Sequence, residues 1–574
     1  MKRFFLLLLA AFSFLAISAC KDNNANGEDP EPVEPVDTIP NYLVMVYGTG
    51  GSTLDRSILS NIIQAIDEGG DEKVKITFEF KMSDSWQKNP DYVDFNGTRR
   101  FSYDDNSEFT GTFRDKTAEY PFLDSSALQY YLKNLKSEKI GDETYDISSP
   151  ESLTDFIKWS KEKYPDAKRT LLILNSHGYG WKIAEDGNVA SRSILPDDNL
   201  DKKVLTDKDV MNGINNAGGV DVLYTDACLM NMYENIYTYA KAVKYLLSAM
   251  ETTPGMGGNY QKLISLLKNS NTDDESLEHT FCEYTDFCAS KEWWGMEKGV
   301  YADLGFYNLS KLDNITNVLK KVSSTLTEKF TSEESIQATV TELPYGDSFA
   351  PYIRVAVTKC EMAQHHYAFT LYEMPDPLKP YMIADGLFGN PEDIQDEKKT
   401  YCDVPQLTYW LRVAPTDGAK EAFDLYPQQR DGLMFLLTLI MNCSYSITDM
   451  LRILDNELTD FGANNNPFKS LRAELLEAIK SMGHIACTTP KIRPEIDEAY
   501  ELCSPGLVII PLNSDTYYND YNQALYVIDD YNQALKNYQS SYFDMEIGWS
   551  NFLQVLDVQP SPLTNKTRLD VDSE

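Results

Sequence analysis

The 574-residue chain is poor in positive charge and poor in histidine, and beyond its N-terminus it lacks long apolar runs. Lys and Arg number 52 against 88 Asp and Glu, which gives a formal net charge of −36. Because nucleic-acid affinity is supplied largely by Lys and Arg, this balance argues against DNA or RNA as a partner. After residue 20 no stretch approaches the roughly 20 apolar residues that a membrane-spanning helix requires.

The cysteines and histidines also lack the spacings of a metal site. A zinc ribbon or a redox motif requires two cysteines with two residues between them, and none of the nine cysteines forms such a pair. Cys282 and Cys288 have five residues between them. His365 and His366 are adjacent, and adjacent residues of a strand point to opposite faces. The acidic stretch "NTDDESLEH" at 271–279 lacks the glycine and spacing of an EF-hand loop. No metal site is therefore predicted, and disulfides are permitted but not required.

The N-terminus has the pattern of an export signal. Two basic residues precede an apolar stretch, and the small pair Ser18-Ala19 comes directly before Cys20. This arrangement resembles the lipobox of bacterial lipoproteins, which implies a signal peptide over 1–19 and lipidation of Cys20. Residues 20–40, rich in Pro and acidic side chains, are expected to form a disordered tether. The predicted location is the bacterial outer membrane, to which the lipid anchor attaches the protein. The sequence leaves undecided whether the protein faces the cell surface.

From residue 41 onward, apolar strand-like stretches alternate with segments of helical periodicity. This alternation predicts an α/β fold with a mostly parallel sheet flanked by helices, as a domain over 41–335. Beyond it the pattern changes to short strands mixed with helices, which predicts an α+β domain over 336–574. The expected strands of the first domain are 41–51, 73–82, 169–176, 220–226 and 245–251, and those of the second include 351–359, 365–374 and 506–512.

Two of the predicted strands end in residues that carry chemistry. "LLILNSHGYGW" (171–181) leads into His177 and "GVDVLYTDACLM" (219–230) leads into Cys228. In parallel sheets the carboxyl ends of the strands form the crevice in which ligands bind. A thiol becomes a strong nucleophile as the thiolate, which a nearby imidazole favours. The separation, 228 − 177 = 51 residues, is close to the ~50-residue offset of caspase-type enzymes.

Neighbouring residues suggest further roles. A glycine after the histidine permits close approach of the backbone to a substrate, so the amides of Gly178 and Cys228 are expected to form an oxyanion hole. Asp226 lies two residues before the cysteine and should point in the same direction if the strand alternates. A carboxylate there is suited to a basic substrate side chain.

The motifs resemble those of a known family. "SHGYGW" and "DACLMNMYENIYTYAKAVKYLLSAMETTPGMGGNY", with "YLVMVYGTGGSTLDRS" near the front and "GLVIIPL…MEIGWSNFL" near the end, are similar to the clostripain family of cysteine peptidases. The resemblance implies a caspase-like fold and cleavage after Arg or Lys. It implies His177 as acid and base, Cys228 as nucleophile and Asp226 in the floor of the substrate pocket.

The resemblance carries two further implications. Some members of the family require calcium, although the chemistry itself needs no cofactor. Some also cleave themselves between the two catalytic residues, and this chain has Arg192, Lys202 and Lys203 in that interval. The expected partners are protein or peptide substrates, and the sequence gives no indication of an oligomeric state.

A second function remains open at this stage. A surface lipoprotein with this fold could bind peptide or glycan without turnover. Such a binding protein has no need of either His177 or Cys228, so their joint presence favours the enzyme.

Overall fold

The computed structural model describes residues 39–50, 54–82, 97–112, 125–142, 144–181, 194–197, 200, 203–250, 253–290, 293, 303–331, 444–448, 451, 455, 466–487, 506–508 and 531–558. Residues 39–574 form one compact unit. The N-terminal signal, the tether up to residue 38, the predicted strands at 351–359 and 365–374, and the pair His365-His366 lie outside the described residues.

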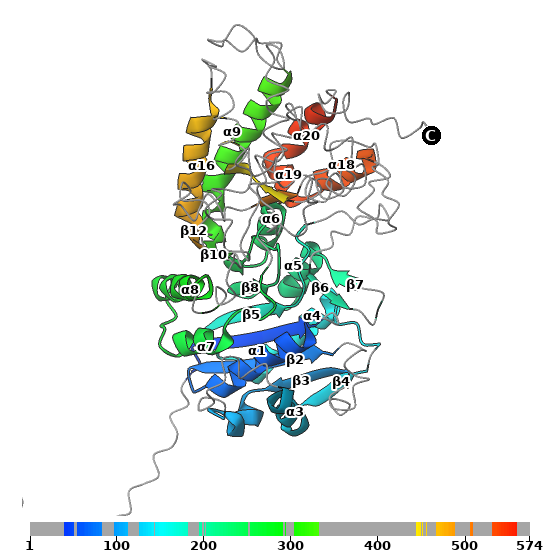
Figure 1. The fold of residues 1–574 in the computed structure, drawn as a ribbon, viewed down its shortest axis with the longest axis vertical. Coiled ribbons are helices and arrows are strands. Elements are labelled where there is room, and N and C mark those ends of the chain that lie inside the picture. Colours follow the sequence, from blue (N-terminus) through cyan, green and yellow to red (C-terminus); the bar gives the residue numbers. More distant parts are fainter. Residues whose placement is uncertain are drawn as a thin grey trace, which may run out of the picture. The chain divides into compact units, whose positions relative to one another are not determined.

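A nine-stranded sheet forms the centre of this unit (Figure 1), in the order β12-β10-β9-β8-β5-β1-β2-β3-β4. The five strands from β9 to β2 are mutually parallel, whereas β3, β4, β10 and β12 add antiparallel edges. The strands are β1 (Tyr42–Thr49), β2 (Val74–Lys81), β3 (Thr98–Ser102), β4 (Glu138–Gly141), β5 (Arg169–Asn175), β8 (Val222–Asp226), β9 (Tyr245–Ser248), β10 (Asp303–Asn308) and β12 (Gly483–Cys487). The predicted α/β fold class is confirmed.

Two smaller sheets and the helices complete the described structure. The pairs β6 (Ile194–Asp197) with β7 (Lys203–Leu205), and β11 (Ser444–Ser446) with β13 (Gly506–Val508), are both antiparallel. The α-helices are α1 (Asp55–Glu68), α3 (Ser125–Asn134), α4 (Pro150–Lys163), α5 (Asp207–Asn216), α6 (Tyr233–Tyr239), α7 (Tyr260–Lys268), α8 (Asp274–Cys288), α9 (Leu312–Thr331), α16 (Phe468–Met482), α18 (Tyr531–Gln539), α19 (Tyr542–Ile547) and α20 (Trp549–Val558). Short 3-10 helices are η1 (Asp104–Phe109) and η5 (Leu309–Lys311).

The sheet separates two hydrophobic cores, and β1 shows how its residues divide between them. Leu43, Met45 and Tyr47 belong to a core with α4, α5, α6 and the C-terminal helices, whereas Tyr42 and Val44 belong to a core with α1, α7 and α8. This division follows from the alternation of side chains along a strand. Because both faces are covered, the central strands are apolar throughout, which is why their sequence reads as continuous hydrophobic runs.

Local signals explain where several helices begin. At the start of α4, Ser149 accepts a hydrogen bond from the Ser152 amide and precedes Pro150; serine at the N-cap and proline at the first helical position both favour a helix start. Thr206 and Asp209 form a capping box at the start of α5. Helix α6 ends at Tyr239, and the apolar residues from 245 pair with β8 as strand β9, within the predicted strand 245–251.

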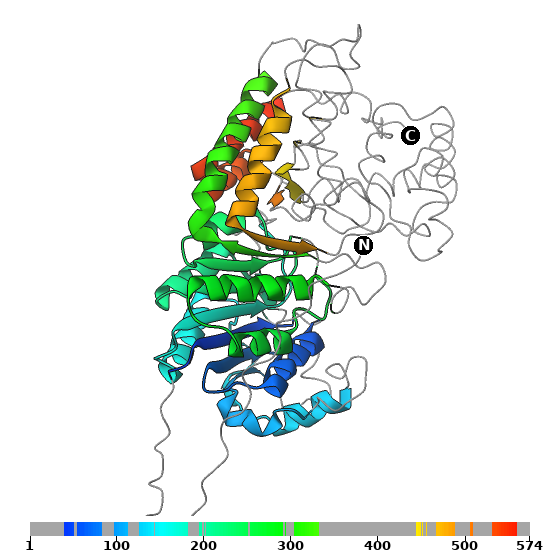
Figure 2. The same ribbon diagram turned by 90° about the vertical axis from the view of Figure 1, so that its left-hand side faces the viewer.

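Residues far along the chain return to the sheet. Strand β12, at residues 483–487, pairs antiparallel with β10, and α9 packs against both α16 and α20. Figure 2 shows α9 in green beside α16 in orange. The sheet therefore draws strands from both sides of residue 335, and the predicted division there stays a prediction.

Candidate functional site

The first predicted catalytic residue follows β5. His177 lies two residues beyond Asn175, the last residue of the strand, and is partly buried. Its backbone carbonyl accepts a hydrogen bond from the Leu195 amide at 3.3 Å, and Gly178 forms a bridge with Ile194 of β6. The backbone of the histidine loop is therefore held from one side by β6.

The second follows β8. Cys228 lies two residues beyond Asp226, the end of the strand, and is a free, partly buried cysteine. The next residue, Leu229, has a positive φ of 64°. A left-handed backbone is costly for a side chain other than glycine, and such strained residues gather at functional sites. The chain thus turns sharply after the thiol before α6 begins at Tyr233.

The pairing of β5 with β8 brings the two loops together. The strands are parallel, and Asn175 lies opposite Asp226, so His177 and Cys228 each stand two residues beyond a matched pair. The Ser176 amide donates to the Asp226 carbonyl at 3.3 Å and extends the contact by one residue. The prediction that both strand ends belong to one site therefore agrees with the register.

Gly178 packs directly on the backbone of the cysteine loop. A Cβ atom at this position would collide with the carbonyl oxygen of Cys228 and would lie 3.0 Å from its amide nitrogen. Only glycine permits this approach. The two amides that the sequence suggested for an oxyanion hole therefore belong to backbone segments in contact.

The thiol has contacts with Thr253, a residue that the sequence analysis did not single out. The Thr253 amide donates to Cys228 Sγ at 3.3 Å, and Thr253 Oγ1 lies 3.6 Å from the sulfur. Burial raises the pKa of the Cys228 thiol, and the hydrogen bonds with Thr253 oppose that rise. Thr253 follows β9, the strand next to β8, so its place at the site depends on the sheet order.

Asp226 lies behind the cysteine in a buried hydrogen-bond network. Its carboxylate accepts from the Gly258 amide at 2.9 Å and from the Tyr260 hydroxyl at 3.0 Å. Burial raises the pKa of Asp226 to about 6, while those two hydrogen bonds lower it. The side chain is 3% exposed. Its contact with a substrate side chain stays a prediction.

The same network includes residues from β5 and α1. Asn175 donates to the Tyr260 hydroxyl at 2.7 Å and to Asn61 Oδ1 at 3.1 Å, and Asn61 donates to the Gly258 carbonyl at 2.9 Å. These bonds connect β5, α1 and the turn before α7. The carboxylate at the end of β8 is thus surrounded by side chains that the sequence analysis did not identify.

The interval between His177 and Cys228 is fixed at β6 by a buried ion pair. Lys81 Nζ lies 2.6 Å from Asp197 Oδ2 and also donates to the Tyr145 carbonyl at 2.6 Å, and both charged groups are buried. Lys203 pairs with Asp146 near the surface. Of the three residues suggested for self-cleavage, Arg192 and Lys202 lie outside the described residues.

A C-terminal tyrosine contacts the segments that follow both predicted catalytic residues. The Tyr538 ring of α18 lies edge-on to Trp181, with centroids 5.3 Å apart. Its hydroxyl donates to Glu234 of α6 at 3.1 Å. Trp181 follows the histidine loop and Glu234 follows the cysteine loop. Sequence reasoning missed Tyr538, because nothing local relates residue 538 to residues 181 and 234.

The described residues do not test the predicted calcium requirement. Within them no group of three or more His, Cys, Asp or Glu could hold a metal ion. In the acidic stretch 271–279, Asp273 accepts from the Ser276 amide at 2.9 Å and so caps α8. A calcium requirement therefore stays a prediction. In the part of the chain that the structure describes, no helix combines the length and the apolar character needed to cross a membrane.

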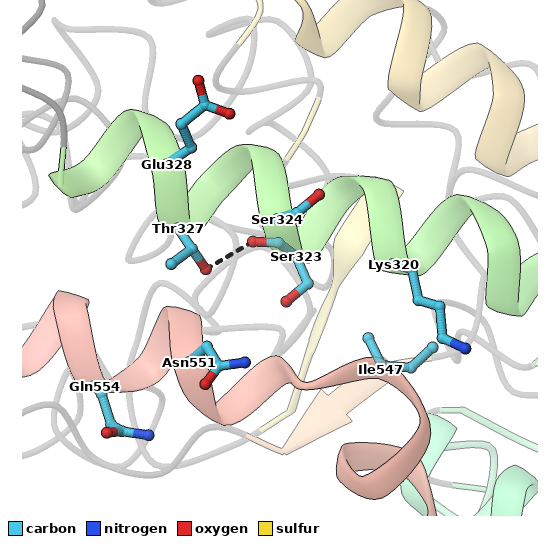
Figure 3. Close-up of a pocket in the computed structure, with 8 residues that line it drawn as sticks. All are labelled: Lys320, Ser323, Ser324, Thr327, Glu328, Ile547, Asn551 and Gln554. Carbon is cyan, nitrogen blue, oxygen red and sulfur yellow. Dashed lines mark hydrogen bonds between the residues drawn. The ribbon is translucent and has the colours of Figure 1, made fainter.

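A separate cavity lies between α9 and the helices α19 and α20 (Figure 3), with a volume of about 550 Å³. It is lined by Lys320, Ser323, Ser324, Thr327, Glu328, Ile547, Asn551 and Gln554. Thr327 Oγ1 donates to the Ser323 carbonyl at 2.8 Å along one wall. The lining includes no histidine or cysteine and takes no residue from the loops after β5 and β8.

Together, these features define a class: an α/β protein with a thiol and an imidazole at adjacent carboxyl ends of parallel strands. Residues 132–417 match the model of the Clostripain family. The chain therefore belongs, over this segment, to the clostripain family of cysteine peptidases.

Individual relatives have low sequence identity to this chain. Clostripain of Hathewaya histolytica is 24% identical over 208 residues, and the match spans 32% of this chain and 39% of that relative's length. A secreted C11 cysteine protease from Bacteroides thetaiotaomicron, iotapain, has 15% identity and a TM-score of 0.32, over 50% of this chain and 71% of its own. An inactive zymogen C11 protease from Parabacteroides distasonis has 16% identity and a TM-score of 0.34, over 54% and 74%.

Proposed function

We propose that this chain is a cysteine endopeptidase that hydrolyses peptide bonds after Arg or Lys, with His177 and Cys228 as its catalytic pair. The observation that carries the proposal is the register of β5 and β8, which places the two residues at adjacent strand ends. Membership of a cysteine peptidase family supports it. A thiol and an imidazole at one crevice are the groups that nucleophilic acyl transfer requires.

The reaction follows from these groups. His177 takes the thiol proton, and the Cys228 thiolate attacks the carbonyl carbon of the scissile bond. The amides of Gly178 and Cys228 hold the developing oxyanion. His177 then gives its proton to the leaving amine, which departs and leaves a thioester on Cys228. Water, deprotonated by His177, hydrolyses the thioester and restores the free thiol.

Asp226 is the proposed source of the preference for basic side chains. Its carboxylate is close in sequence to the nucleophile and is approached by Gly258 and Tyr260, so a pocket bounded by these residues would have an acidic end. A buried carboxylate pairs strongly with Arg or Lys when the pair is shielded from water.

Peptide hydrolysis tests this proposal. Fluorogenic peptides ending in Arg, Lys, Asn or Asp are offered to the protein and to Cys228→Ala, with calcium and with a chelator. We expect turnover of the Arg and Lys peptides that the substitution abolishes. Turnover limited to another residue would remove the role of Asp226 and keep the catalytic pair. An absence of turnover under every condition would favour a lipoprotein that only binds peptide or glycan.

We also propose that the chain is exported and lipid-anchored through Cys20, since the residues before it have the pattern of a lipoprotein signal. Cells grown with an alkyne-labelled fatty acid should incorporate the label into the wild-type chain. Cys20→Ser should remove the label and release the protein from the membrane fraction. Equal labelling of both chains would contradict the assignment of Cys20.

A further inference from the structure

Thr253 stands at the end of a third strand beside the proposed catalytic pair. Strands β5, β8 and β9 are adjacent and parallel, and Thr225 of β8 lies opposite Ser248 of β9. His177 and Cys228 follow the first two strands, and Thr253 follows the third, five residues after Ser248. The sheet thus brings the three loops to the same edge, at the carboxyl ends of its parallel strands.

Two donors of Thr253 are directed at the sulfur. The backbone amide donates to Cys228 Sγ at 3.3 Å, and the hydroxyl oxygen lies 3.6 Å from it, within range of a hydrogen bond to sulfur. The Thr253 carbonyl lies 3.9 Å from Sγ, where it can accept from the neutral thiol. Thr253 can therefore donate hydrogen bonds to the thiolate through its amide and hydroxyl, and can accept one from the neutral thiol through its carbonyl.

The surroundings of the thiol create a need for such donors. Cys228 is partly buried, and burial disfavours the charged thiolate. The carboxylates of Asp226 on β8 and Asp303 on β10 disfavour it further. In the proposed mechanism, His177, after β5, accepts the proton of the Cys228 thiol. Hydrogen bonds to an ionised group are stronger than those to a neutral one, so donors fixed on Sγ favour the thiolate selectively.

We propose that Thr253 is a catalytic residue whose amide and hydroxyl stabilise the thiolate of Cys228. This inference rests on the proposed function, because it takes Cys228 as the nucleophile. The proton that leaves Sγ passes to the His177 imidazole, and the resulting negative charge on sulfur is shared with the two Thr253 donors. When the new S–C bond forms, the charge moves to the carbonyl oxygen and the Thr253 donors are released.

The test is the pH dependence of alkylation at Cys228. Full-length protein, solubilised in detergent, is treated with iodoacetamide between pH 5 and 10, and modification is followed by mass spectrometry of the peptide that contains Cys228. Thr253→Val removes the hydroxyl at nearly constant shape and keeps the amide. We expect the midpoint of the alkylation profile to rise by about 0.5–1 pH unit in this variant. Thr253→Ser, which keeps a hydroxyl, should restore most of the wild-type profile.

Two controls keep the result interpretable. Thr154→Val removes a threonine hydroxyl from α4, where it donates to the Pro150 and Gly213 carbonyls, and should leave the midpoint unchanged. Thermal unfolding of each variant identifies loss of structure. If Thr253→Val lowers the melting temperature substantially, Thr253→Ala, which adds no new apolar contact, replaces it in the comparison with Thr253→Ser.

An unchanged midpoint in the folded hydroxyl-free variant would overturn the proposal, and so would a rise of equal size in Thr253→Ser. Alkylation does not depend on peptide turnover, so this outcome is distinct from failure of the proposed function. Hydrolysis that survives Cys228→Ala would refute Cys228 as the nucleophile, and an absence of hydrolysis in the wild-type protein would refute the peptidase assignment. A shift of the midpoint confined to the hydroxyl-free variants establishes the Thr253 contact.

Discussion

At the scale of single residues, the site combines the proposed nucleophile, Cys228, with a buried acid two positions before it. Asp226 is fully surrounded by protein, yet its carboxylate has only neutral donors among its described hydrogen-bond partners, the Gly258 amide and the Tyr260 hydroxyl. Neutral donors offset burial only in part, which explains why its pKa rises to about 6. This acid is therefore held at a cost to stability when it is charged.

The cost predicts a pH-dependent effect of Asp226→Asn. The pKa of Asp226 is about 6 in the folded chain against about 3.9 unfolded, so the folded state binds more protons between these values. The neutral carboxyl is favoured by folding, and this contribution to stability is lost as the pH rises from about 4 to 6. Above pH 6 the charged, buried carboxylate lowers the free energy of unfolding by the full amount. The amide variant lacks this penalty. Its free energy of unfolding relative to wild type should increase by roughly 2–3 kcal/mol between pH 4 and pH 7.

Urea unfolding of both proteins at several pH values measures this difference. Asp71→Asn, at an exposed turn residue whose carboxylate accepts from the Lys73 and Val74 amides, controls for the loss of one charge. A difference between wild type and Asp226→Asn that stays constant across the pH range would show that the carboxyl does not titrate in this window.

At the scale of elements, the helix α18 links the two loops of the site. Tyr538 is fully buried and contacts Trp181 through its ring and Glu234 through its hydroxyl. Glu234 lies on α6, which begins directly after the cysteine loop. Through this contact, the C-terminal segment holds the segments that follow β5 and β8 in a fixed relation.

Tyr538→Phe should therefore impair the site while retaining the fold. The variant keeps the ring contact with Trp181 and loses a hydrogen bond to a buried carboxylate, which costs about 1.5–3 kcal/mol. We expect the free energy of unfolding to fall by that amount and kcat to fall several-fold with little change in KM. Steady-state peptide hydrolysis and urea unfolding measure the two effects.

Tyr542→Phe is a matched control, because its ring contacts Lys208 of α5 and Lys241 in the turn after α6. It should leave kcat unchanged. If both tyrosine variants lowered kcat equally, the effect would come from general loosening of the C-terminal helices rather than from the link between the loops.

The elements also show what the sequence could predict and why the rest was out of reach. Strands β5 and β8 were predictable because each is a short apolar run that ends in polar residues, and the start of α4 was predictable from Ser149-Pro150. The placement of His177 and Cys228 after adjacent strand ends followed from a general rule of parallel sheets. These signals are local or depend only on strand order.

Thr253 follows the predicted strand 245–251, so the same rule of strand ends applied to it, but the sequence analysis did not single it out. Asn61 and Tyr538 had no such signal, because each reaches the site through a contact across many residues of sequence. Strand β12 was missed for a related reason, since its pairing with β10 joins residues about 180 apart along the chain. Long-range pairing depends on the packing of the whole sheet and cannot be derived from local patterns.

At the scale of the whole molecule, one sheet organises both the site and its support. Parallel strands at its centre deliver the loops of His177, Cys228 and Thr253, and antiparallel strands close its edges. The C-terminal helices share a core with β1, α4 and α6 on one face of that sheet. The site is thus supported by residues that the chain supplies from beyond position 460.

The proposed function depends on Cys228, assisted by His177, as the nucleophile. The most direct measurement is covalent capture by a peptidyl electrophile ending in Lys or Arg, with the adduct located by mass spectrometry of the digested protein. We predict a single adduct on Cys228, formed at least tenfold more slowly in His177→Ala. An adduct spread over several cysteines, or one that forms on Cys228 at the same rate without His177, would contradict the account.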